Sequence, residues 1–287
     1  MTDKKYMRIF ALSDIHIDFN ENQRWVNNLS DTDFKNDVLI LAGDICHNLE
    51  KLKNNLLNLR GKFTAMTFVP GNHDLWVRGE HWKNSIEKFD DIIGFCRDND
   101  ITVQPQKFGQ VWMVPLFSWY TEPADGEDSL YWPKPGEDKS NRMWSDRYFV
   151  KWPAGDNGFS ASRYFFERNR EMLDGTYEGT VISASHFIPR KEMMFHEYPP
   201  KIDPEKIKKY DRNPGFNFSR VAGSSLIEEQ IRIVGAQIHV YGHQHINRDR
   251  EIDGVRYVAH CLGYPSERRR GTIRGIEEGI KQIWPDE

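Results

Sequence analysis

Five short segments of the sequence place Asp, His or Asn side chains directly after an apolar run. They are DIH at residues 14–16, GD ending at Asp44, GNHD at residues 71–74, SH ending at His186, and GHQH at residues 242–245. Imidazole nitrogens and carboxylate or amide oxygens are common protein ligands of divalent transition metals. Any one of these segments is more often an ordinary loop, but five in one chain indicate a shared metal site.

The residue types in these segments suit a centre of two cations. Two divalent ions ~3.5–4 Å apart need a group that binds both, in addition to ligands of their own. A carboxylate has two oxygens and can serve as this bridge, whereas a neutral imidazole is a good terminal ligand. Gly43, Gly71 and Gly242 immediately precede such residues, and we expect them to let the backbone turn sharply where the ligands converge.

The first hundred residues predict alternating strands and helices that would bring these segments together. Strand-like runs at residues 7–12, 37–42 and 67–69 are followed by helix-like patterns at residues 22–29, 49–61 and 82–96, with Gly61 as the expected end of the second helix. This alternation predicts βαβ units with reactive groups at the carboxyl ends of parallel strands. Asp14, Asp44 and Asn72 are 30 and 28 residues apart, which fits one βαβ unit for each step.

The rest of the chain predicts further strands and helices around one irregular segment. We expect strands at residues 101–103, 111–116, 180–185, 237–241 and 280–284, helices at 164–173 and 224–234, and a hairpin turn at 253–254.

Residues 118–158 have no clear periodicity and are rich in Gly, Pro and aromatic side chains. This segment is either a cap over the site, in which Arg142, Arg147 and Lys151 could contact a phosphate, or an excursion that packs on the body of the domain.

Composition narrows the class of protein. The formal net charge of −4 argues against binding to a nucleic-acid backbone, and the three cysteines, Cys46, Cys96 and Cys261, do not form a disulfide framework or a Cys-based zinc site. The N-terminal residues read as a strand and not as a secretory signal, and no apolar stretch is long enough to span a bilayer. We therefore expect a soluble, cytoplasmic protein; its oligomeric state stays open.

The ordered set of motifs resembles the calcineurin-like metallophosphoesterase family, whose pattern is D-x-H, G-D, G-N-H-[D/E], a lone H, and G-H-x-H. The pattern is complete here as DIH, GD, GNHD, SH and GHQH, and it extends over residues 14–245. The resemblance implies an α/β fold with a four-layer αββα arrangement, in which two mixed sheets are flanked by helices. It further suggests a single domain over residues 1–287, with the aromatic-rich insertion at about 118–158.

The resemblance also implies a role for each motif residue. Two divalent or trivalent ions (Mn, Fe or Zn) would be bound, and a metal-bridging hydroxide would hydrolyse a phosphate ester. His73 would not bind metal; it would face the phosphate and its leaving group as the catalytic residue. The implied ligands are Asp14, His16, Asp44 and His245 for one ion, and Asp44, Asn72, His186 and His243 for the other, with Asp44 shared.

The remaining polar residues near the motifs allow several interpretations. Asp74 is expected to support the loop and not to bind metal, and Cys46 and His47 are candidates for a similar supporting role. His239 is expected to be an ordinary sheet residue. A small phosphorylated substrate is favoured, but the sequence does not separate a monoesterase from a diesterase. A nuclease of the same family and a non-catalytic metal-binding scaffold are the alternatives.

Overall fold

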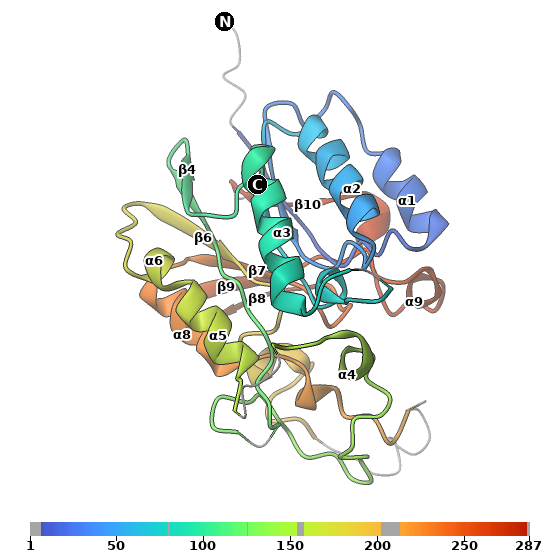
Figure 1. The fold of residues 1–287 in the computed structure, drawn as a ribbon. Coiled ribbons are helices and arrows are strands. Elements are labelled where there is room, and N and C mark those ends of the chain that lie inside the picture. The colour runs from blue at the N-terminus through green and yellow to red at the C-terminus, as the bar shows by residue number, and fades with distance from the viewer. Residues whose placement is uncertain (1–6, 80, 125, 154–157, 202–212, 286–287) are drawn as a thin grey trace, which may run out of the picture.

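The computed structural model describes residues 7–79, 81–124, 126–153, 158–201 and 213–285. They form two mixed β-sheets that pack face to face, with helices on the outer side of each sheet (Figure 1). Helices α1, α2 and α3 lie beside one sheet, and α5, α6 and α8 lie beside the other. The α/β sandwich of two mixed sheets that the motifs imply is therefore confirmed.

The first sheet has the strand order β10-β1-β2-β3. Strands β1, β2 and β3 are parallel, and β10 pairs antiparallel to β1. The parallel strands come from the βαβ units of the first seventy residues, so their carboxyl ends share one edge. The strands are β1 (Ile9–Leu12), β2 (Val38–Ala42), β3 (Ala65–Val69) and β10 (Lys281–Trp284).

The second sheet has the strand order β4-β5-β6-β7-β9-β8. Its four inner strands are parallel, and β4 and β8 are antiparallel additions at the two edges. The turn at residues 253–254 joins β8 to β9 as the expected hairpin. The strands are β4 (Gln106–Phe108), β5 (Val111–Pro115), β6 (Thr180–Ala184), β7 (Ile238–Tyr241), β8 (Arg248–Ile252) and β9 (Val255–Ala259).

Polar side chains start several of the helices. Asn48, Asn84 and Ser224 each accept a hydrogen bond from a backbone N–H of the first turn that follows. The described helices are α1 (Asn20–Asn27), α2 (Leu49–Lys62), α3 (Ser85–Asp98), α4 (Asp146–Phe149), α5 (Ala161–Arg168), α6 (Arg170–Leu173), α8 (Ser225–Ile233) and α9 (Pro265–Arg269), with short 3-10 turns at His73–Leu75, Lys191–Met194, Phe218–Arg220 and Ile276–Glu278.

The apolar strands are buried on both faces. Val38, Ile40 and Ala42 of β2 pack between the sheets, while Leu39 and Leu41 of the same strand face the helices. This double burial explains why β2 is an unbroken apolar run rather than an alternating one. The core between the sheets lies directly behind the loops that follow these strands, so it fixes the positions where those loops begin.

Several details differ from the sequence prediction: β4 and α4 are additional elements, α1 lies two residues earlier, and α3 begins at Ser85 and not at residue 82. Residues 101–103 contribute only an isolated bridge, Thr102 to Thr67, and not a strand. The expected helix at 164–173 is two helices separated at Asn169, because the Asn169 side chain bonds to the backbone N and O of Phe117. Helix α2 continues past Gly61 and ends at Lys62.

No helix in the described part of the chain has both the length and the apolar character needed to cross a membrane.

Candidate metal centre

All seven predicted ligands lie on loops that follow the carboxyl ends of five strands. Asp14 and His16 follow β1, Asp44 follows β2, Asn72 follows β3, His186 follows β6, and His243 and His245 follow β7. The first three of these strands belong to one sheet and the other two to the second sheet. The two sheets therefore contribute to one site at their common edge.

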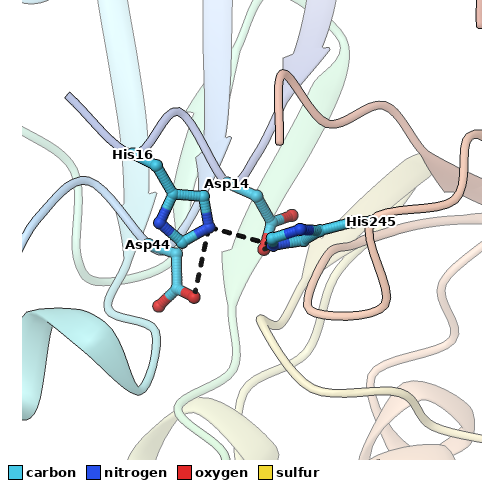
Figure 2. A group of neighbouring side chains, drawn as sticks. All are labelled: Asp14, His16, Asp44 and His245. Carbon is cyan, nitrogen blue, oxygen red and sulfur yellow. Dashed lines mark hydrogen bonds and ion pairs between the residues drawn. The ribbon is translucent and has the colours of Figure 1, made fainter. Parts of the chain in front are cut away.

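One group of side chains consists of Asp14, His16, Asp44 and His245, whose potential ligand atoms all lie within 4.8 Å of one another (Figure 2). The Nε2 atoms of His16 and His245 are 2.9 Å apart. The Nε2 atom of His245 is 3.4 Å from Asp14 Oδ1, and that of His16 is 3.9 Å from Asp44 Oδ2. The distances are short enough for all four side chains to bind a single ion.

A second group consists of Asp44, His186 and His243, and their potential ligand atoms also lie within 4.8 Å of one another. The Oδ1 atom of Asn72 is 3.1 Å from both His186 Nε2 and His243 Nδ1, which adds an amide oxygen to this group. Asp44 Oδ1 is 3.5 Å from His186 Nε2. Asp44 is thus common to both groups, with one oxygen toward each.

Three histidines have a hydrogen-bond partner on the ring nitrogen that faces away from the site. His186 Nδ1–H donates to Ala42 O at 2.9 Å and His243 Nε2–H donates to Val221 O at 2.9 Å. His245 Nδ1–H donates to a carboxylate oxygen of Glu267 at 2.8 Å. In a neutral imidazole the other nitrogen is then an acceptor, which is the form that binds metal.

The charges in the site also suit cations. Burial raises the pKa of Asp44 well above its ordinary value, and the nearby carboxylates of Asp14 and Asp74 raise it further. Burial lowers the pKa values of His16, His186 and His243, which keeps these rings neutral. A bound divalent cation would compensate the buried carboxylates and accept the imidazole lone pairs, so the residues present fit a metal centre.

Burial lowers the pKa of His245, but hydrogen bonds to Asp14 and Glu267 outweigh this and raise it to about 10. Asp14 lies on the Nε2 side of His245 and Glu267 on the Nδ1 side, so the two carboxylates stabilise positive charge at both nitrogens of this ring.

The backbone is unusual at the candidate ligands. Non-glycine residues with φ between about +20° and +160° are uncommon and tend to mark functional sites. Among the described residues, five of the eight with such a φ are candidate ligands. They are Asp14 (49°), His16 (38°), Asp44 (58°), His243 (73°) and His245 (55°).

The glycines in the motifs mainly leave space for neighbouring carboxylate side chains. Of the three, only Gly43 has a positive φ (+78°), so the expected sharp turn applies to it alone. A Cβ atom at position 71 would lie 2.2 Å from Asp44 Oδ1, and one at position 242 would lie 2.6 Å from Asp14 Oδ2. Gly71 and Gly242 are therefore needed because the backbone passes against the ligand carboxylates.

Asp74 holds two of the loops together. Its carboxylate accepts hydrogen bonds from the backbone N–H groups of Asp44 (2.9 Å), Ile45 (2.8 Å), Cys46 (3.2 Å) and Gly71 (2.9 Å). Burial raises the pKa of Asp74 to about 6, and these four bonds act against the increase. The Asp74 carboxylate thus uses its acceptor positions to join the loop that carries Asp44 to the loop that carries Asn72.

The side chains of Cys46 and His47 have other partners. The Cys46 thiol donates to Asn48 O at 3.2 Å, and burial raises its pKa. His47 Nδ1 lies 3.3 Å from Asp18 Oδ1, where both side chains are partly exposed. Neither contact involves a candidate ligand.

His73 lies beside the ligands at the rim of a cavity of about 300 Å³. Its backbone N–H donates to Asp44 Oδ1 at 2.9 Å, and its Nε2 is 3.9 Å from Asp44 Oδ2 and 3.5 Å from the Tyr264 hydroxyl. The cavity is lined by Asp44, Asn72, His73, Trp76, Met143, Trp144, Ser145, Asp146, Asn213, Phe216, Phe218, His243, Gln244, His245, Tyr264 and Glu267. Ligand groups and aromatic side chains therefore face the same space.

Sequence reasoning missed three residues of the site, Asp146, Tyr264 and Glu267. Glu267 accepts the hydrogen bond from His245, Tyr264 lies near His73, and Asp146 accepts one from Asn72. Asp146 belongs to the irregular segment, and Tyr264 and Glu267 lie at the start of α9, so none of them is part of a motif. The local signal is Pro265 followed by Glu267, which marks the start of α9, where the backbone N–H of Tyr264 donates to Glu267 Oε2 at 2.8 Å.

The basic residues of segment 118–158 do not line this cavity. Arg142 pairs with Asp138, and Arg147 donates to the backbone oxygen of Ser140. Instead, residues 143–146 of the segment lie at the cavity, so its contribution is aromatic, apolar and acidic.

Comparison with known proteins identifies the family. Residues 7–247 match the family model described as calcineurin-like phosphoesterase. The chain is 25% identical over 301 residues to the [acyl-carrier-protein] phosphodiesterase PptH of Mycobacterium tuberculosis, covering 97% of this chain and 83% of that protein.

The crystal structure of phosphopantetheinyl hydrolase (PptH) from M. tuberculosis has the same fold, with a TM-score of 0.71 and 22% sequence identity over 97% of this chain and 96% of that chain. The family match covers most of the chain and contains every candidate ligand. The chain belongs to the calcineurin-like phosphoesterase family and is a hydrolase of phosphoester bonds.

Proposed function

We propose that the chain is a phosphodiesterase that uses two metal ions, one held by Asp14, His16, Asp44 and His245 and the other by Asp44, Asn72, His186 and His243. The observation that carries the proposal is the position of Asp44, whose two oxygens face the two groups of ligands. Two divalent ions bound there would polarise phosphoryl oxygens and lower the pKa of a water that serves as nucleophile. The ligand types admit Mn, Fe or Zn.

His73 is proposed to act on the leaving group. His73 lines the cavity, its Nε2 atom is 3.9 Å from Asp44 Oδ2, and its imidazole stacks on the Trp76 ring. From this position an Nε2–H group can donate a hydrogen bond or a proton to the oxygen that departs from phosphorus. The bond from the backbone N–H of His73 to Asp44 ties the position of the ring to the ligands.

The lining of the cavity favours a diester over a monoester. None of the described residues that line it is Lys or Arg, so within the described part of the lining the positive charge would come from the metals alone. Burial lowers the pKa of His73, whose neutral ring offers an N–H donor. A diester carries a single negative charge, whereas a monoester at neutral pH carries nearly two and gains more from additional cations. Trp76, Trp144 and Tyr264 offer flat walls for the organic groups on either side of the phosphate.

The similarity to PptH gives a first candidate for the substrate. PptH is named as a phosphodiesterase of acyl carrier protein and as a phosphopantetheinyl hydrolase. We propose that this chain also acts on a phosphodiester that joins a small organic group to a larger molecule, with phosphopantetheinyl acyl carrier protein as the first substrate to test. The buried, unpaired cysteines Cys46, Cys96 and Cys261 agree with a reducing compartment such as the cytoplasm.

Segment 118–158 is proposed to form a cap within a single domain. Met143, Trp144, Ser145 and Asp146 lie along the cavity, and the Trp144 ring is 5.7 Å from that of His243, centroid to centroid. These contacts support the proposal that segment 118–158 limits the size of the substrate groups that fit beside the metals.

The test is the hydrolysis of matched esters by metal-loaded protein. We expect bis-p-nitrophenyl phosphate to be cleaved with a higher kcat/KM than p-nitrophenyl phosphate, and acyl carrier protein to lose its phosphopantetheinyl group, measured by mass spectrometry. Equal or better cleavage of the monoester would contradict the diesterase assignment. Cleavage of single-stranded DNA in preference to both would favour a nuclease, and bound metal without any hydrolysis would favour a non-catalytic scaffold.

A further inference from the structure

The carboxylate of Asp146 has an unusual set of partners for a buried charge. It lies at the first residue of α4, inside segment 118–158, and its residue is only 2% exposed. It accepts N–H groups from three side chains: Asn72 Nδ2 at 2.8 Å, Trp76 Nε1 at 2.7 Å and Trp144 Nε1 at 3.0 Å. Asp146 is thus bonded directly to a candidate ligand from a part of the chain that carries no motif.

This bond decides which end of the Asn72 amide faces the metal site. The amide has a donor end and an acceptor end, and only the oxygen can bind a cation. An ionised carboxylate only accepts hydrogen bonds, so Asp146 requires the NH2 group on its own side. The oxygen is then directed away from Asp146, 3.1 Å from His186 Nε2 and 3.1 Å from His243 Nδ1.

Without Asp146, the Asn72 amide would favour the orientation in which its NH2 group faces His186 and His243. His186 and His243 donate from their outer nitrogens to Ala42 O and Val221 O, so their inner nitrogens are acceptors. Two acceptors would favour the NH2 end of Asn72 between them, which presents no ligand atom to a metal. The orientation that binds a cation therefore has to be imposed from the other side of the amide.

The segment that carries Asp146 is hydrogen-bonded to the chain that runs from β3 into the first residue of α3. Val77 N–H donates to Phe149 O at 2.9 Å, and Ser85 N–H donates to Lys151 O at 2.7 Å. The Ser85 hydroxyl also accepts from Lys151 N–H at 3.0 Å. These bonds hold α4 and the residues after it against the same stretch of chain that presents Asn72.

We propose that Asp146 is a positioning residue that orients the Asn72 amide for the metal held by Asp44, Asn72, His186 and His243, and that segment 118–158 thereby controls that half of the centre. The inference rests on the proposed metal site. It adds a second role for segment 118–158, which is needed to form the metal centre as well as to cover it. Loss of a partner that orients a metal ligand typically weakens metal binding by roughly 10–100-fold.

The experiment titrates metal-free protein with Mn²⁺ by calorimetry and compares Asp146→Asn with Ser85→Ala. Ser85→Ala removes a bond to the same segment but leaves the Asp146–Asn72 contact, so it controls for loss of local stability. We expect wild type to bind two ions, Asp146→Asn to bind one of them at least about 10-fold more weakly, and Ser85→Ala to retain both affinities. Thermal unfolding of each variant checks that it is folded.

Exchanging the two residues gives a result that a merely structural role would not produce. Asn72→Asp alone sets two carboxylates against each other and should weaken the site, whereas Asn72→Asp combined with Asp146→Asn restores one donor facing one acceptor. We therefore expect Asp146→Asn to weaken Mn²⁺ binding in wild type and to strengthen it in the Asn72→Asp background. An effect of the same sign in both backgrounds, or unchanged affinity in Asp146→Asn, would overturn the inference. Failure of wild type to bind two ions would instead contradict the proposed metal centre.

Discussion

The imidazole of His73 stacks on the indole of Trp76, with ring centroids 3.8 Å apart and ring planes 28° apart. The same indole donates its Nε1–H to Asp146 at 2.7 Å. The orientation of His73 is therefore linked, through one tryptophan, to the residue that also bonds Asn72. A proposed catalytic group and a proposed ligand thus depend on one buried carboxylate.

Replacement of His73 should separate chemistry from metal binding. We expect His73→Ala to keep about two metals per chain, as in wild type, but to lose on the order of 10²–10⁴ in turnover, the scale of a lost general acid. The loss should be smaller for p-nitrophenyl esters, because their leaving group needs less protonation. His81→Ala, at an exposed histidine whose ring is tilted against that of Trp82, is the control and should be fully active. A loss that is independent of the leaving group would exclude the proton-donor role.

Replacement of the shared carboxylate should affect both ions. Asn has one ligand oxygen and no charge, so Asp44→Asn should bind fewer than two metals per chain by mass spectrometry. Asp37→Asn is the matched control, since Asp37 is also buried but pairs with Arg8 far from the motifs. It should lower stability and retain both ions. Retention of both metals by Asp44→Asn would show that Asp44 is not the bridge.

The space beside Gly71 gives a steric test. A Cβ at this position would lie 2.2 Å from Asp44 Oδ1, so Gly71→Ala has to displace the carboxylate and should weaken metal binding at least as much as Asp44→Asn. At Gly61, inside α2, a Cβ would have no atom within 4 Å. Gly61→Ala should therefore raise the free energy of unfolding by up to about 1 kcal/mol and leave metal content unchanged.

If metal content is the same in both glycine variants, the close approach at position 71 is not important for binding.

His239 should make stability depend on pH independently of the metal site. This histidine is buried in β7, as the sheet residue that the sequence predicts, with its ring nitrogens 2.8 Å from Ser183 Oγ and 3.0 Å from Ser185 Oγ. Burial lowers its pKa to about 3.

Above the ordinary pKa of about 6.5 the ring is neutral in both the folded and the unfolded state, and no penalty arises. Below it the unfolded chain takes up a proton that the folded chain does not, so stability falls as the pH decreases toward 3.

The expected loss from His239 is about 2 kcal/mol between pH 8 and pH 5. Urea unfolding at the two pH values, compared between wild type and His239→Gln, isolates this contribution because the other titrating groups are common to both proteins. An equal pH dependence in the two proteins would mean that His239 is protonated in the folded state.

The sequence alone could name the candidate ligands because each is part of a short local pattern, and the structure brings these side chains together. Asp14, Asp44 and Asn72 follow apolar strands directly, and their spacing reflects one βαβ unit after another. Asp146 and Glu267 were not predictable in this way. Asp146 contacts Asn72, 74 residues away, and Glu267 contacts His245, 22 residues away. No local sequence pattern marks a residue whose role is to hydrogen-bond a metal ligand.

The same reason accounts for the errors in the fold. The run at residues 101–103 is apolar enough for a strand, but it forms only the single bridge from Thr102 to Thr67. Whether a strand forms depends on the backbone that lies beside it as well as on its own composition. Asn169 divides a helix because its side chain bonds to the backbone of Phe117, 52 residues earlier. Gly71 and Gly242 were expected to serve sharp turns, whereas the need for space becomes visible only when Asp44 and Asp14 are in place.

The division of the ligands between the two sheets has a mechanical consequence. Asp44 and Asn72 extend from the first sheet, while His186 and His243 extend from the second, and the apolar layer lies between them. An ion bound by all four side chains would cross-link the two sheets at the edge where their strands end. Binding energy would then oppose the sliding or separation of the two sheets, so chelation should lower the melting temperature of the entire domain and not only loosen the loops around the site.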